Sequence, residues 1–196
     1  MARYAAIDCG TNSLRLLISE DNHGRPREIV RLMEIVRLGQ GVDATGEFAP
    51  EALERTRKVL TKYVDLMQQE RVQDVRMVAT SATRDARNKD EFFAMTAELL
   101  GQIRPGACAQ VITGEEEAKL SFIGAVAYLS KEQGPFCVID LGGGSTEFVV
   151  GVAGGQLLGS YSSQMGCVRI SERIMQSDPP TPEEVEAARQ YVAERL

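Results

Sequence analysis

Two short segments of the chain each combine an aspartate with a glycine turn and hydroxyl side chains. The first covers residues 8–13 (Asp-Cys-Gly-Thr-Asn-Ser) and the second covers residues 140–146 (Asp-Leu-Gly-Gly-Gly-Ser-Thr). Glycine permits backbone angles that bring N–H groups close to an anion, and Ser and Thr hydroxyls add donors. A single run of three glycines could be only a flexible hairpin. Two such turns facing each other would grip consecutive phosphate groups, and we expect them to do so.

The aspartates that open these segments, Asp8 and Asp140, each end an apolar stretch. A carboxylate in a cleft needs a hydrogen-bonding partner or a cation. Mg²⁺ keeps much of its hydration shell and uses one or two carboxylates together with substrate oxygens. We therefore expect Asp8 and Asp140 to hold Mg²⁺ through water molecules.

Three consecutive glutamates, Glu115, Glu116 and Glu117, begin an expected helix over residues 114–131. If the first turn of this helix points toward a cleft, one of these carboxylates could activate a water molecule. In the alternative interpretation, the three acids only complement the positive end of the helix dipole on a solvated surface. The residues alone leave both interpretations open.

Arginines close to the glycine turns could neutralise the charge of a phosphate substrate. Arg84 and Arg87 follow an expected strand in a loop rich in Ser and Thr, where a guanidinium can bind two phosphate oxygens at once. Each could equally form a surface salt bridge. The residues that we expect to bind substrate phosphate are Gly10, Thr11, Asn12, Ser13, Arg15, Arg84, Arg87, Gly142, Gly143, Gly144, Ser145 and Thr146.

Composition and charge exclude several classes of protein. The 196 residues are 43% hydrophobic and 26% charged, which is ordinary for a globular chain of one large or two small domains. A net charge of −6 gives no support to binding of nucleic acid or of an anionic membrane. No apolar run is long enough to span a membrane, and Asp8 comes too early for a signal peptide. We expect a cytoplasmic protein.

Histidine and cysteine are placed unfavourably for other hydrolytic mechanisms. The only histidine, His23, lies in a sequence typical of a turn, so a Ser-His-Asp or Cys-His triad is not expected. The four cysteines are widely spaced and lack the pairing typical of zinc sites, and we expect free thiols.

The hydrophobic pattern predicts alternating strands and helices. The expected order is three strands, a helix, a strand, a helix, a strand and a helix, at residues 4–9, 14–19, 28–38, 50–70, 75–80, 90–100, 109–112 and 114–131. This order predicts an α/β fold with a mixed, largely parallel sheet flanked by helices.

A second unit is expected after the break at residues 133–135 (Gln-Gly-Pro). Strands are predicted at 136–140, 147–151 and 156–162, followed by a helix from Pro182 whose capping box is Thr181 and Glu184. With an offset of 132 residues, its first strand and glycine turn match those at Asp8. We therefore predict two duplicated lobes, 1–132 and 133–196, of which the second lacks the later strands.

Four further segments carry a resemblance to a known family. Together with the two turns, they resemble the exopolyphosphatase/guanosine-pentaphosphate phosphatase family over essentially the whole chain. These segments are residues 38–43, 79–88, 112–118 and 163–166. The resemblance implies an actin-like (ribonuclease H-like) fold of two lobes with the site between them. It also implies Glu117 as the base that activates water, with Glu116 a weaker candidate, and Glu147 as a catalytic residue that binds water or metal.

The expected reaction is release of terminal orthophosphate from inorganic polyphosphate, with Mg²⁺ and a water activated by glutamate. Guanosine pentaphosphate (pppGpp) is the alternative substrate, because both are linear phosphoanhydrides. Rival interpretations are an ATP-dependent kinase or ATPase, which needs an adenosine pocket usually built by the later second lobe, and a non-catalytic phosphate sensor. Family members are typically longer, so the chain is expected to be a fragment. Exposed apolar edges of its second lobe would favour a homodimer.

Overall fold

A computed structural model of the protein describes residues 1–22, 25–130 and 133–196. His23 and the predicted boundary at residue 132 lie outside the described residues. The chain divides into two units, Met1–Val111 and Ile112–Leu196, and each is described by itself. In the described part of the chain, no helix is long and apolar enough to cross a membrane.

The first unit contains a five-stranded mixed sheet with the strand order β3-β2-β1-β4-β5. The first three strands form an antiparallel meander, and β4 and β5 are parallel to β1. The strands are β1 (Arg3–Cys9), β2 (Ser13–Asn22), β3 (Arg25–Ile35), β4 (Asp74–Ala79) and β5 (Ala109–Val111). The predicted α/β architecture with a mixed sheet is confirmed.

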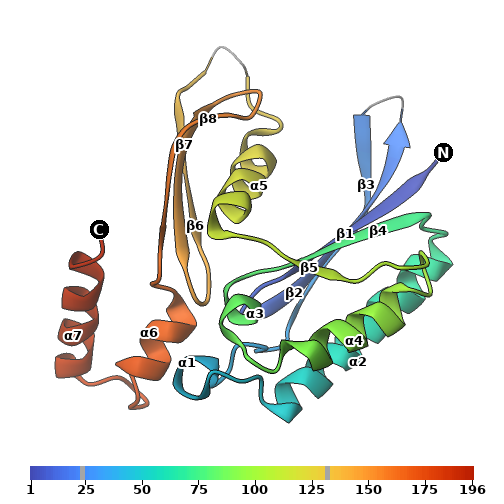
Figure 1. The fold of residues 1–196 in the computed structure, drawn as a ribbon. Coiled ribbons are helices and arrows are strands. Elements are labelled where there is room, and N and C mark those ends of the chain that lie inside the picture. Colours follow the sequence, from blue (N-terminus) through green and yellow to red (C-terminus); the bar gives the residue numbers. More distant parts are fainter. Residues whose placement is uncertain (23–24, 131–132) are drawn as a thin grey trace. The chain divides into compact units, whose positions relative to one another are not determined.

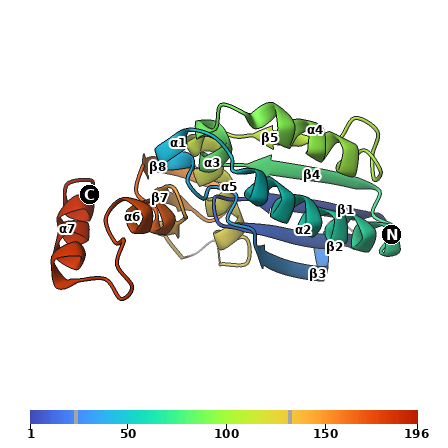
Figure 2. The same cartoon turned by 90° about the horizontal axis from the view of Figure 1, so that it is seen from below.

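Alternation along the strands of this sheet buries one face. Ile7 and Leu16 are directly opposed on β1 and β2, and both are about fully buried. The helices α2 (Pro50–Gln69) and α4 (Lys89–Leu100) lie side by side over this face (Figures 1 and 2). Tyr63 of α2 is 2% exposed and donates a hydrogen bond of 2.9 Å to the carbonyl of Leu14. The start of β2 is therefore held by the core of its own unit.

The second unit contains a three-stranded antiparallel sheet with the order β6-β7-β8. One face is covered by α5 (Gly114–Val126), through the buried side chains of Phe122 and Val126 against Val149 (Figure 1). The other elements of this unit are β6 (Phe136–Leu141), β7 (Thr146–Val152), β8 (Gln156–Ser163), α6 (Cys167–Arg173) and α7 (Pro182–Ala193). The predicted capping box of Thr181 and Glu184 is confirmed at the start of α7.

The opposite face of the second sheet exposes apolar side chains. Ile139 is 61% exposed and Leu141 67%, and Tyr161 stacks on Phe148 on the same face. At an offset of 132 residues, Ile139 corresponds to Ile7, which is 1% exposed in the first unit. The apolar character of this face is therefore matched in the first unit by a face that helices cover.

Several element boundaries differ from those predicted. Three short helices were not predicted: α1 (Val42–Thr45), α3 (Ser81–Asp85) and α6. The strand expected at 28–38 is shifted, because the N–H groups of Val36 and Arg37 instead bind the carbonyl of Asn12. The helix expected at 114–131 ends at Val126, and residue 131 lies outside the described residues.

The division between the units also differs from the predicted boundary. It falls between Val111 and Ile112, because the apolar side chains of α5 pack on the sheet that follows this helix in the chain. The interpretation of the two lobes as copies of each other stays a prediction.

Candidate functional site

The first glycine turn is held rigidly within its unit. A hydrogen bond of 3.0 Å from the Gly10 N–H to the Ser13 carbonyl closes the turn between β1 and β2. Thr11 is 8% exposed, and its hydroxyl is hydrogen-bonded to that of Ser81 at 2.8 Å. The Thr11 carbonyl accepts a bond of 2.8 Å from the N–H of Gly39. The loop expected to resemble the family thus supports the first turn.

Asp8 lies directly across from Arg15 on the neighbouring strand. The Arg15 Nη1 and Asp8 Oδ2 atoms are 3.4 Å apart, and both side chains are about half exposed. An exposed pair of this kind contributes little to stability. Both groups remain accessible to solvent, and the first turn therefore pairs an acid with a base.

The second glycine turn has the same closing hydrogen bond. The N–H of Gly142 donates to the carbonyl of Ser145 at 2.9 Å, which matches the Gly10 to Ser13 bond at the offset of 132 residues. The carbonyls of Gly142 and Gly143 accept bonds from the start of α6, and the Nε of Arg169 donates to Gly144 at 2.9 Å. Ser145 and Thr146 are each 2% exposed.

Arg169 was not predicted as a site residue. Its guanidinium reaches the second glycine turn from a helix that starts twenty or so residues later, a reach of about one helical turn from its own backbone. The only signal in the sequence is an arginine shortly after the segment 163–166, which on its own is weak.

The turn of α6 onto the glycines requires glycine at position 166. A Cβ added at Gly166 would lie 2.3 Å from the carbonyl oxygen of Gly143. We expect Gly166→Ala to destabilise the protein by about 1–3 kcal/mol, because the backbone of one segment must move. Thermal unfolding measures this effect. Gly159→Ala is the matched control, since a Cβ there meets nothing within 4 Å, and equal unfolding temperatures for the two variants would contradict the prediction.

Two carboxylates oppose each other beside the second glycine turn. The register of β6 and β7 places Asp140 directly across from Glu147, on the face of the sheet that α5 covers. Glu147 is 1% exposed and accepts a hydrogen bond of 2.9 Å from the Ser162 hydroxyl. The Ser121 hydroxyl donates to Asp140. Like charges at directly opposed positions destabilise a sheet, and a cation would relieve that repulsion.

This pair of acids fits the ligand preference of Mg²⁺. The ion binds through one or two carboxylates and keeps several waters. Among residues 1–22, 25–130 and 133–196, no group of three or more His, Cys, Asp or Glu side chains is arranged to hold a metal. Remaining ligands would have to be water or substrate oxygens. The two turns thus differ at equivalent positions, with Arg15 in the first and Glu147 in the second.

Glu117 lies in the first turn of α5. Thr113 caps this helix by accepting a hydrogen bond of 3.1 Å from the N–H of Glu116. Glu117 is partly buried, whereas Glu115 is exposed. Glu117 and Ser121 are four residues apart, so their side chains share one face of the helix. Because Ser121 contacts Asp140, that face is turned toward the two opposed carboxylates, and this distinguishes Glu117 from Glu116.

Arg87 is engaged by the backbone of its own unit. Its Nη2 atom is 2.9 Å from the carbonyl of Thr45 and 3.3 Å from Oε1 of Glu47. Arg84 lies on α3 and is partly buried. The contacts of Arg87 stabilise the loop after α1, and a phosphate would have to compete with them.

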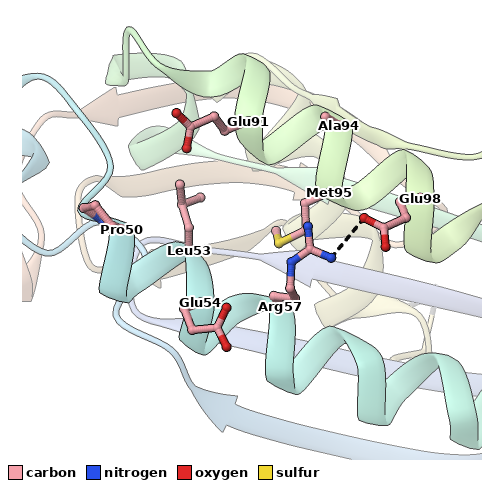
Figure 3. Close-up of a pocket in the computed structure, with 8 residues that line it drawn as sticks. All are labelled: Pro50, Leu53, Glu54, Arg57, Glu91, Ala94, Met95 and Glu98. Carbon is pink, nitrogen blue, oxygen red and sulfur yellow. Dashed lines mark hydrogen bonds and ion pairs between the residues drawn. The ribbon is translucent and has the colours of Figure 1, made fainter.

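A surface groove in the first unit contains none of the expected site residues. It lies between α2 and α4, where Arg57 reaches across to Glu98 at 3.0 Å (Figure 3). Glu54 and Glu91 also line it. Three glutamates against one arginine disfavour an anionic substrate here.

Comparison with known proteins gives consistent matches. The model of the Ppx/GppA phosphatase family matches residues 17–196. Exopolyphosphatase 2 of Mycobacterium tuberculosis is 56% identical over 200 residues, which cover 100% of this chain and 62% of that protein. The chain therefore spans less than two thirds of the length of this relative.

Solved structures give the same picture. An exopolyphosphatase-like protein is 40% identical with a TM-score of 0.88, covering 98% of this chain and 59% of its own. An exopolyphosphatase from Cytophaga hutchinsonii is 29% identical with a TM-score of 0.87, covering 99% and 60%. The Ppx/GppA family member of Aquifex aeolicus is 35% identical with a TM-score of 0.73, covering 95% and 58%.

Proposed function

The chain belongs to the Ppx/GppA phosphatase family, and we propose that it hydrolyses linear phosphoanhydrides, releasing terminal orthophosphate from inorganic polyphosphate. The actin-like fold expected from the family resemblance is confirmed by the similarity to solved Ppx/GppA structures. The observation that carries the proposal is the contact of Ser121 with Asp140. It turns the helix face of Glu117 toward two opposed carboxylates next to a glycine turn.

In the proposed reaction, Glu117 is the general base. Its carboxylate accepts a proton from a water molecule while the water oxygen attacks the terminal phosphorus in line. The bond between that phosphorus and the bridging oxygen breaks, and the shortened polyphosphate leaves with the bonding electrons. Positioning and electrostatic stabilisation supply most of the acceleration in such reactions.

Charge on the phosphoryl oxygens requires donors and cations. We assign the donor role to the two glycine turns, to Arg15 and Arg84, and to Arg87 where a phosphate displaces its contacts. Arg169 joins this group because its guanidinium already lies at Gly144. Asp140 and Glu147 would hold Mg²⁺, with Asp8 as a further expected ligand. The bound ion would supply positive charge against the charge that develops on the transferred group.

Guanosine pentaphosphate remains the alternative substrate, and the family description includes both activities. Its triphosphate end offers the same linear phosphoanhydride to the same donors. A homodimer and a cytoplasmic location also stay predictions from the sequence.

Phosphate release from three substrates tests the proposal. Long-chain polyphosphate, guanosine pentaphosphate and ATP are each assayed with and without Mg²⁺. We expect release from polyphosphate that requires Mg²⁺, and little from ATP. Release from ATP alone would support the kinase or ATPase interpretation instead. Tight binding of polyphosphate without release would support a phosphate sensor.

A further inference from the structure

Two serine hydroxyls contact the two opposed carboxylates from different elements. Ser121 lies on α5 and donates to Asp140, and Ser162 lies on β8 and donates to Glu147 at 2.9 Å. Neither serine was singled out by the sequence. Both belong to the same unit as the carboxylates that they contact.

The start of α5 lies directly against Ser162. A Cβ added at Gly114 would be 3.0 Å from the Ser162 hydroxyl oxygen and 3.3 Å from its Cβ. Glycine at this position therefore allows the first turn of the helix, which carries Glu117, to approach β8. Through Ser162 this turn is connected to Glu147, and through Ser121 the next turn is connected to Asp140.

We propose that Ser121 and Ser162 are positioning residues for the reaction, which orient Asp140 and Glu147 toward a shared cation and hold them in register with Glu117. The inference rests on the proposed function of the carboxylates. Two like charges at opposed positions tend to diverge, and each hydroxyl holds one of them in a defined orientation. A hydrogen bond to the charged form of a buried carboxylate also favours that form. The chemistry recognised is that of a divalent cation.

A purely structural role makes a different prediction. If the serines only satisfied buried acids, their removal would lower the unfolding temperature and leave the orientation of Glu147 and the affinity for a cation unchanged. Outer ligands that orient metal-binding side chains typically change metal affinity when they are mutated. The two roles can therefore be separated by measuring orientation and affinity.

The test uses the 196-residue chain and three variants. Ser162→Ala removes the hydroxyl, Ser162→Cys keeps nearly the same volume with a weak donor, and Ser160→Ala removes an exposed hydroxyl of the same strand. Three-bond couplings to Glu147 Cγ in ¹³C,¹⁵N-labelled protein without metal report the χ1 rotamer. Electron paramagnetic resonance measures the affinity for Mn²⁺.

We expect the couplings of Glu147 to change from those of one rotamer to averaged values in both Ser162 variants. The affinity for Mn²⁺ should fall by about tenfold, and Ser160→Ala should change neither quantity. Ser121→Ala should lower the affinity in the same direction. A single Glu147 rotamer and an unchanged affinity in Ser162→Ala would overturn the proposal, as would a Ser162→Cys variant that behaves like the wild type.

The rotamer measurement requires neither metal nor substrate. If the wild-type chain released no phosphate and bound no Mn²⁺, the proposed function would fail, whereas the couplings would still decide whether Ser162 orients Glu147.

Discussion

The Glu117→Gln variant should fold normally and turn over polyphosphate about a hundredfold more slowly or worse. Glutamine keeps the shape of the side chain but cannot accept the proton of the attacking water. The helix itself should form as before, because Thr113 caps it through the N–H of Glu116 and its core contacts come from Phe122 and Val126. Steady-state phosphate release measures the rate, and circular dichroism confirms the fold.

Neighbouring glutamates provide the controls for this experiment. Glu115 is exposed in the same helical turn, and we expect Glu115→Gln to keep nearly full activity. Glu116→Gln should also be mild, since residue 116 does not share the helix face of Ser121. Near-normal activity of Glu117→Gln together with a large loss in Glu116→Gln would move the base one position earlier. Near-normal activity in all three variants would refute a glutamate base on α5.

The Glu147→Gln variant should lose its response to Mg²⁺ without losing stability in the absence of the ion. Glutamine removes one of two opposed negative charges, and its amide oxygen can still accept the hydrogen bond from Ser162. For the wild type, Mg²⁺ at about 100 times its Kd should add ~2.7 kcal/mol to the free energy of unfolding. That increment should disappear in the variant, and activity should fall with it. Thermal unfolding at increasing Mg²⁺ concentration measures both proteins.

An exposed glutamate on α7 of the same unit serves as the comparison. Glu183→Gln changes the net charge equally but lies away from the opposed pair, so its response to Mg²⁺ should equal that of the wild type. If Glu147→Gln kept the full stabilisation by Mg²⁺, the metal would have to bind elsewhere.

The strands and the long helices could be predicted from the sequence because their signals are local. Alternation of apolar residues places Ile7 and Leu16 in the core, and the apolar spacing over residues 50–70 forms α2 as expected. The two glycine turns could also be recognised, and their matching hydrogen bonds show that the patterns at Asp8 and Asp140 form the same type of turn. The helices α1, α3 and α6 were missed because each is too short to show a helical period.

Contacts between distant residues account for most of what the sequence could not predict. The partners of Asp140 and Glu147 depend on the register of β6 and β7 and on how α5 packs, and neither is written in residue types alone. Arg87 illustrates the same limit. Its sequence context favoured a phosphate contact and a salt bridge equally, and the structure shows its guanidinium bound to the loop after α1.

The uncovered face of the second sheet also makes a cysteine chemically addressable. Cys137 lies on β6 on the same face as Ile139 and is exposed, whereas Cys9 is fully buried and burial raises the pKa of its thiol. Only the thiolate reacts readily with alkylating reagents, so Cys9 should be inert in the folded chain. The rate of alkylation at Cys137 then becomes a direct measure of whether another polypeptide surface lies over this face, and Cys9 serves as the internal reference.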